Sequence, residues 1–373
     1  MSSRRHRDVA VVIGICAITL VLGSVGKACR GFWHDPMSLL CHSDIRSLYH
    51  LRELDRDRVP YLHGDLIVVP RPDRPWPPFE LQPRGGANEY PVLTGILMWL
   101  PSIVSDSPDT YLLASMVLLA PFGLATAWIL GLMTGRRAFA WAASPLLVLY
   151  AFHNWDLAVV AASVAGFWCW WRGRPVVAAA CFGVGGALKL YPLLFLLPLV
   201  LERVHAGDRR EAVRAGLAGA GTFLLINLPL LVLSPSGWAV TFRFQGLRMP
   251  NHDSLWGVLA QTFELDRPAI NALSSVAVVA VLAVVTVEIE RRARREGAYP
   301  FLPACAALLA GFLLVGKVHS PQYALWLVPL FVLVPIRLGW YALLVVGNVL
   351  MYVAIFGISV WSTEARDVLV TWS

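Results

Sequence analysis

Long apolar segments dominate the chain and limit the folds that it can adopt. Its mean hydropathy is +0.62, 57% of its residues are hydrophobic and only 15% are charged. Backbone groups inside a bilayer must hydrogen-bond within the protein, so segments this apolar are expected to cross the membrane as helices. We predict an all-α polytopic membrane protein with about eleven transmembrane helices, near residues 9–27, 110–134, 138–152, 157–171, 175–188, 191–202, 213–234, 269–288, 299–316, 322–336 and 338–360.

Arginine residues gather in alternate short loops and predict the orientation of the chain. Three of them lie within residues 4–7, so the positive-inside rule places the N-terminus in the cytoplasm. The later arginine clusters then also fall on the cytoplasmic side of a multi-pass plasma-membrane protein, which explains the net charge of +7 without a nucleic-acid surface. Four short polar loops are expected on the extracytoplasmic side: HNWD (153–156), KLYP (189–192), 243–254 and 317–323.

We expect residues 1–373 to form a single membrane domain whose first extracytoplasmic loop, 28–109, is much longer than the others. Within this loop, 42–58 reads as a charged amphipathic surface helix, and the proline-rich stretch 66–88 is expected to be ordered only by docking. Residues 89–104 are too short for a span and would reverse the side of every later loop, so we interpret them as an interfacial or re-entrant helix.

A second anomaly is the apolar stretch 176–203, which Lys189 and Pro192 interrupt near its middle. Two short helices that meet at this point accommodate both residues, because broken helices are tolerated where they line a cavity.

The six cysteines show neither metal-ligand spacing nor a C-x-x-C motif, so we expect no metal site. Cys29 and Cys41 share the first outer loop and are candidates for a disulfide, whereas the other four read as small apolar residues within spans. The N-terminal segment has some features of a signal peptide. Gly26-Lys27-Ala28 is a poor cleavage site, however, and a retained first helix is the better interpretation.

Lys189 is the most informative charged residue. Placing an ionisable group within an apolar membrane segment costs free energy, so such a residue usually has a function. It either binds an anionic group such as a phosphate, with help from Tyr191, or extends to the interface as an anchor. The second cluster holds Lys317, His319 and Gln322 at a helix start. Part of that motif is ordinary helix initiation at Ser-Pro, but a helix N-terminus beside a cation is also a phosphate site.

The remaining outer motifs permit both structural and functional readings. In HNWD, Asn154 and Asp156 can cap the next helix, or, with His153, they can line a substrate cavity. Arg243 and His252 belong to a loop that either covers a cavity or is simply solvated.

Among the outer carboxylates, Asp44 follows the first span closely and is our candidate general base. The sequence contains no His-x-x-Glu-His, glycine-rich phosphate loop or Gly-x-Ser-x-Gly, which disfavours a zinc protease, an NTPase and an α/β-hydrolase.

Five blocks of the sequence, taken in order, resemble the signatures of glycosyltransferase family 87 over about residues 40–335. They are SDIRSLYHLRELDRDRVPYL, EYPVLTG, HNWDL, ALKLYPLLFLLPL and VHSPQYALWLVPL. The resemblance implies a GT-C-like fold and an enzyme that moves a hexose, usually mannose, from a polyprenyl-phosphate carrier to a lipid or glycan acceptor with inversion. The chain departs from the family pattern in ending soon after the last predicted span.

The resemblance also implies roles for individual residues. Asp44 would be the catalytic base. The KLYP and VHSPQY blocks would bind the carrier phosphate through Lys189, Tyr191, Lys317, His319 and Gln322, and the substrate cavity would be lined by Glu89, Tyr90, His153, Asn154, Asp156, Arg243 and His252.

We therefore expect an extracytoplasmic membrane glycosyltransferase that needs no cofactor beyond its polyprenyl-phosphate sugar donor. The alternatives are a lipid or solute transporter, which would need polar residues through the depth of the membrane, and a non-catalytic lipid-binding subunit, which would have no need for Asp44.

Overall fold

The structure is a computed structural model that describes residues 3–28, 40–56, 58–71, 79–251 and 254–357. The protein is mostly helical, at 77%. Within these described ranges, five helices are long and apolar enough to cross a membrane, namely Arg5–Lys27, Pro108–Ala142, Arg209–Leu233, Arg267–Glu296 and Leu338–Phe356. Shorter apolar helices cover most of the other predicted spans, at Asp156–Trp171, Pro175–Leu188, Phe301–Val315 and Pro321–Leu333. The apolar pattern thus located the helices, whereas the number of spans stays a prediction.

The chain divides into two compact units. The first unit comprises residues 1–57, 97–168 and 321–373, and the second comprises 58–96 and 169–320. Two helices, α3 (Val92–Ser102) and α7 (Asp156–Trp171), each contain a division point.

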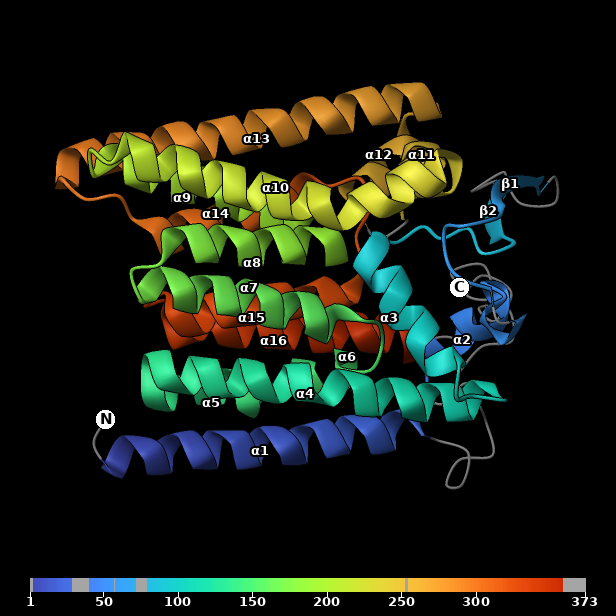
Figure 1. The fold of residues 1–373 in the computed structure, drawn as a ribbon, viewed down its shortest axis with the longest axis horizontal. Coiled ribbons are helices and arrows are strands. Elements are labelled where there is room, and N and C mark those ends of the chain that lie inside the picture. Colours follow the sequence, from blue (N-terminus) through green and yellow to red (C-terminus); the bar gives the residue numbers. More distant parts are fainter. Residues whose placement is uncertain (1–2, 29–39, 57, 72–78, 252–253, 358–373) are drawn as a thin grey trace. The chain divides into compact units, whose positions relative to one another are not determined.

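In the first unit, α1 (Ser3–Lys27) lies along α4 (Pro108–Thr134) and packs against two short helices, α5 (Phe139–Ala142) and α6 (Pro145–Tyr150) (Figure 1). The remaining elements of this unit are α2 (Asp44–Leu51), η1 (Leu54–Arg56), η2 (Gly135–Ala138), η4 (Pro321–Tyr323), α15 (Ala324–Leu333), α16 (Leu338–Tyr352) and the terminal π-turn η5 (Val353–Gly357).

Two predictions about these segments need correction. The span expected at 138–152 is two short helices, because Pro145 starts a new helix after a break at Ser144. The surface helix expected over 42–58 ends at Leu51, and only the short turn η1 follows it.

The proline-rich stretch of the outer loop holds strands, so the chain is not entirely α-helical. Strands β1 (Asp65–Pro70) and β2 (Phe79–Arg84) form an antiparallel pair in which Asp65 lies opposite Arg84. Prolines lie at the ends of this two-stranded sheet or on its edges, where they remove no essential ladder bond.

The second unit is built around α8 (Pro175–Leu188) and α10 (Arg209–Leu233), which pack closely through glycines. A Cβ added to Gly183 would lie 2.4 Å from the carbonyl oxygen of Gly219. The other elements of this unit are η3 (Tyr191–Phe195), α9 (Leu196–His205), α11 (Pro235–Leu247), α12 (Leu255–Thr262), α13 (Arg267–Glu296) and α14 (Phe301–Val315).

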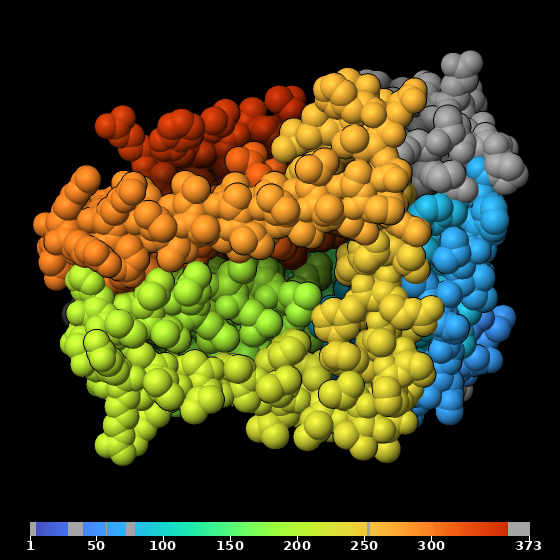
Figure 2. Space-filling view, turned by 90° about the horizontal axis from the view of Figure 1, so that it is seen from above, coloured from blue at the N-terminus to red at the C-terminus, as the bar shows by residue number. Residues whose placement is uncertain are grey.

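Helices α10 and α13 lie at the surface of the protein, as Figure 2 shows, and both are strongly apolar. Only 11% of the most apolar window of each helix is buried. Leu225 and Val284, for example, are each 69% exposed. Surfaces this apolar would be unfavourable in water, which supports their placement against lipid.

The predicted break in the stretch 176–203 is confirmed. Helix α8 ends at Leu188, Lys189 is extended, and Pro192 lies at the start of η3. The hydroxyl of Thr94 donates to the carbonyl oxygen of Leu188 at 2.6 Å, which satisfies one of the acceptors that a helix end leaves open. The chain then turns back so tightly that a Cβ at Gly186 would lie 2.6 Å from the Leu193 side chain.

Candidate active site

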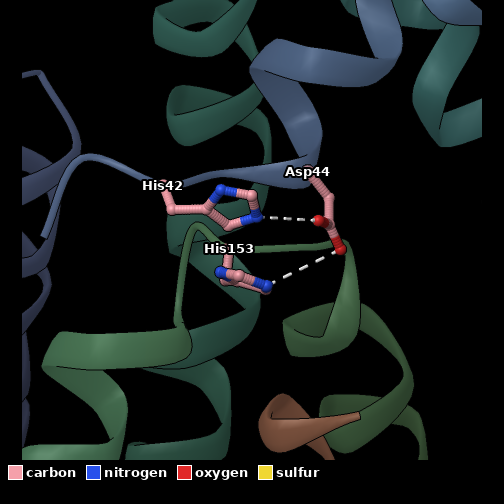
Figure 3. A group of neighbouring side chains, drawn as sticks. All are labelled: His42, Asp44 and His153. Atoms are coloured by element: carbon pink, nitrogen blue, oxygen red, sulfur yellow. Dashed lines mark ion pairs between the residues drawn. The ribbon is translucent and has the colours of Figure 1, made fainter. Parts of the chain in front are cut away.

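Asp44 begins α2 and faces three side chains of the first unit, of which Figure 3 shows those of His42 and His153. Its Oδ1 lies 3.5 Å from Nε2 of His42, and its Oδ2 lies 3.6 Å from Nε2 of His153. The side-chain amide of Asn154 also donates to Oδ2 at 3.0 Å. A carboxylate from the first outer loop is thus held by two residues of the HNWD turn, which the sequence places more than a hundred positions away.

The segment that carries Asp44 is fixed by several hydrogen bonds. The hydroxyl of Ser43 donates to the carbonyl oxygen of Phe152 at 2.8 Å, which ties this segment to the turn before α7. The buried ammonium of Lys27, at the end of α1, donates to the carbonyl oxygen of His42 and to the hydroxyl of Tyr352. The ends of two long helices therefore hold the loop in place.

Aromatic contacts fix the His42 ring. Its centroid lies 4.6 Å from that of Phe356, in a stacked arrangement, and 5.2 Å from that of His153. Both imidazoles consequently present Nε2 to the same carboxylate (Figure 3).

Asp44 is held in its ionised form. Burial by itself opposes the negative charge, but the imidazoles of His153 and His42 and the amide of Asn154 hold the pKa of Asp44 below its ordinary value. Burial lowers the pKa of His153 to about 3 despite the nearby Asp44 charge, so this imidazole is neutral near pH 7. An ionised carboxylate with partly exposed oxygens can accept a proton from an incoming hydroxyl.

Two further polar residues lie in the same unit. Asp156 is fully buried at the start of α7, and its Oδ1 accepts a 2.6 Å hydrogen bond from Nε1 of Trp326. Gln322 is also buried, and its Oε1 makes no hydrogen bond within the part of the chain that the structure describes. Asp156 therefore has a structural partner, whereas Gln322 retains a free acceptor.

Lys189 lies in the second unit, together with other residues predicted for the phosphate site and the cavity. Its buried ammonium lies 5.7 Å from the centre of the Tyr90 ring. The neighbouring residue Glu89 is buried, and so is Tyr191, whose ring packs edge-on against Phe195 at 5.9 Å. The packing of Tyr191 alone is enough to explain its presence.

Lys317 forms a separate cationic group in the second unit. Its ammonium donates to the carbonyl oxygen of Gln245 and to Oδ1 of Asn271, both at 2.7 Å. Burial, together with the charges of Arg248 and Arg267, lowers the pKa of Lys317 to about 8. Two of the three ammonium protons are engaged, and the third makes no hydrogen bond to the residues that the structure describes.

The last predicted site residues are placed as follows. Arg243 pairs with Asp65 at 3.0 Å on an exposed surface, which joins α11 to the hairpin. His319 is half-buried just before η4. His252 lies outside the described residues. Cys41 is disulfide-bonded, and Cys29, its predicted partner, also lies outside them.

Sequence reasoning missed three residues of the Asp44 group: His42, Lys27 and Tyr352. His42 could have been found from the sequence, because it is a histidine two positions before the candidate base Asp44. Lys27 entered the sequence analysis only as part of the poor cleavage site Gly26-Lys27-Ala28, and nothing in the sequence of the last helix marks Tyr352.

Long lipid-facing helices, together with polar groups gathered at helix ends and loops, define an integral membrane protein with a site built at the ends of its helices. The model of glycosyltransferase family 87 matches residues 89–316, more than half of the chain. The chain belongs to glycosyltransferase family 87, as the five sequence blocks predicted. No curated protein and no solved structure matches it.

Membership of this family supports glycosyltransferase activity in a membrane. The matched residues, 89–316, include Lys189 and the HNWD turn, whereas Lys317 lies directly after them and Asp44 lies well before them.

Proposed function

We propose that the protein transfers a hexose, most simply mannose, from a polyprenyl-phosphate carrier to a lipid or glycan acceptor at the extracytoplasmic face of the plasma membrane. The observation that carries this proposal is the ionised Asp44 at a helix start, held by His42, His153 and Asn154. Family membership supplies the class of reaction.

In this mechanism the acceptor hydroxyl attacks the anomeric carbon of the donor. The new C–O bond forms as the bond from the anomeric carbon to the phosphate oxygen breaks, so the configuration inverts. Asp44 takes the hydroxyl proton, and the electron pair of the broken bond leaves with the polyprenyl phosphate.

The departing phosphate needs a cation, and the family resemblance implies two candidates for this role. Lys317 has one ammonium proton without an acceptor among the described residues, and together with Arg248 and Arg267 it forms the more concentrated positive charge. Lys189 beside Tyr90 is the second candidate. Cations that meet a developing phosphate charge stabilise the transition state more than the ground state.

The carrier also accounts for the protein being embedded in the membrane. An isoprenoid tail stays in the bilayer, so its sugar phosphate is available only at the interface. A site built from loops and helix ends, as the Asp44 group is, suits a substrate of this kind.

The test is incubation of membranes containing the protein with radiolabelled polyprenyl-phosphate mannose and other polyprenyl-phosphate sugars, followed by identification of the labelled product. We expect label in a lipid or glycan product with inverted configuration, and none with Asp44→Asn. Transfer from a nucleotide sugar alone would overturn the choice of donor. Binding or movement of the lipid without any transfer would favour a transporter or a lipid-binding subunit.

A further inference from the structure

The contacts of Asp44 are unusual for a half-buried carboxylate. It makes no ion pair with lysine or arginine in the described chain: Lys27 donates to His42 and Tyr352, and Arg46 pairs with Asp109 at 3.1 Å. The carboxylate is faced by two imidazole nitrogens and one amide instead.

The two imidazole distances are longer than good hydrogen bonds. An N–H donor typically lies 2.7–3.2 Å from its oxygen acceptor. His42 and His153 lie 3.5 Å and 3.6 Å from the carboxylate oxygens. Bonds of about 2.0–2.2 Å to a tetrahedral zinc-like ion separate its ligand atoms by roughly 3.3–3.6 Å. The observed separations therefore fit ligands around a small ion better than they fit direct pairing.

All three ligand atoms converge on one place (Figure 3). They lie within 4.8 Å of one another, so a small movement of the rings brings them to one ion. The amide of Asn154 holds Oδ2 of the carboxylate, as the outer partners of metal ligands commonly do. The side chains of His42 and Asp44 are 34% and 27% exposed, which gives an ion and a further ligand a route to the site.

We propose that His42, Asp44 and His153 bind one first-row divalent metal ion with the ligand preferences of zinc. Two imidazole nitrogens and one carboxylate oxygen form a mixed ligand set that suits such ions and is poor for calcium or magnesium. The sequence showed no metal motif, because the ligands come from two distant loops.

Three protein ligands leave at least one position open on the ion. In the transfer reaction proposed above, on which this step rests, the acceptor hydroxyl occupies that position, where the ion lowers its pKa. Its proton passes to the oxygen of Asp44 that does not bind the ion. The binding of the metal itself does not depend on this role.

Metal binding is measured on the full-length protein in detergent after chelator treatment and removal of the chelator. Zn²⁺ is titrated against a chromophoric competitor, and Co²⁺ is used as a spectroscopic probe of nitrogen ligands. We expect one ion per chain and a loss of affinity of at least tenfold in His42→Ala and in His153→Ala.

His50→Ala is the matched control. His50 belongs to α2, the helix that Asp44 begins, and its Nδ1 lies 2.9 Å from Oδ2 of Asp55, but the described residues offer no third metal ligand there. Its affinity for Zn²⁺ should stay within twofold of that of the wild type.

The Co²⁺ spectrum of the wild-type protein is an independent measurement. It tests for nitrogen ligands even if His153→Ala unfolds the turn. Absence of a nitrogen-ligated Co²⁺ spectrum, or unchanged affinity in the double variant His42→Ala/His153→Ala, would overturn the metal proposal. Full transfer by the metal-stripped protein without any Zn²⁺ binding rejects the metal site and leaves the transferase in place. Stoichiometric Zn²⁺ binding without sugar transfer rejects the transferase alone.

Discussion

At the scale of single residues, the protein concentrates its polar chemistry at two kinds of group. In the first unit a carboxylate is held ionised by two imidazoles and an amide, and in the second unit lysines are held beside aromatic or cationic neighbours. Each kind can be tested by a substitution that changes charge and little else.

Asp44→Asn preserves the size and hydrogen-bonding capacity of the side chain but cannot accept a proton. We expect sugar transfer to fall by about 10²–10⁴-fold, as for a lost general base, with donor binding retained. The measurement is initial-rate transfer of labelled sugar, with donor binding measured separately. If Asp44→Asn keeps most of its activity and Glu89→Gln abolishes it, Glu89 is the catalytic base and Asp44 is not.

Lys317 should make donor binding depend on pH. Its folded-state pKa is about 8, lowered by burial and by two arginines, so the free protein carries the charge below pH 8 and loses it above. We expect donor affinity to fall by up to about tenfold per pH unit above that value, because a neutral amine no longer attracts phosphate. Lys317→Arg keeps its charge at every pH and should bind without this decline. Parallel curves for both proteins from pH 7 to 9.5 would show that Lys317 is not a phosphate contact.

Lys189→Met removes the ammonium and keeps much of the apolar stem. If Lys189 contacts the carrier phosphate, donor binding should weaken by about 1.5–3 kcal/mol, roughly ten- to a hundredfold. Equilibrium binding of the polyprenyl-phosphate sugar measures this. An affinity within twofold of the wild type would make Lys189 an anchor beside Tyr90.

At the scale of elements, the close packing of α8 on α10 holds the second unit together. A Cβ at Gly183 would lie 2.4 Å from a backbone carbonyl oxygen, which cannot move without shifting a helix. The same pair of helices supports the turn that carries Lys189.

Gly183→Ala should therefore destabilise the protein by about 1–3 kcal/mol, a typical value for overpacking. Gly221→Ala in α10 is the matched control, since its added Cβ meets nothing within 4 Å. That variant should be neutral or gain up to about 1 kcal/mol from helix propensity. Thermal unfolding in detergent compares the two. An equal midpoint for both variants would mean that the contact between the helices is looser than described.

At the scale of the whole molecule, the proposed side of the site rests on the distribution of arginine. Single cysteines at exposed positions can test it in a background where the four free cysteines are replaced by alanine. In intact cells, an impermeant thiol reagent should label Asp106→Cys and Phe263→Cys, on the predicted outer side, but not Ala206→Cys or Ala298→Cys. All four positions are exposed, so a failure to react reports sidedness and not burial. Labelling of Ala206→Cys would reverse the predicted topology and place the site elsewhere.

The amino-acid sequence alone determined the class of protein and the positions of most helices. The length of an apolar segment can be read from the sequence locally, because a membrane helix satisfies its backbone hydrogen bonds within the segment itself. The break at Lys189 and Pro192 could also be predicted, because a charged residue and a proline interrupt a membrane helix locally. The family match confirmed the resemblance of the five sequence blocks.

Tertiary structure decided what surrounds Asp44. The contacts of His42, His153 and Asn154 with one carboxylate join loops that lie far apart in the chain. Sequence motifs with fixed spacing cannot predict contacts over such a separation. It also decided that the proline-rich stretch forms a hairpin, because strand pairing depends on a partner and not on the strand alone. Local chemistry thus fixed where the helices lie, and only packing fixed which polar side chains meet.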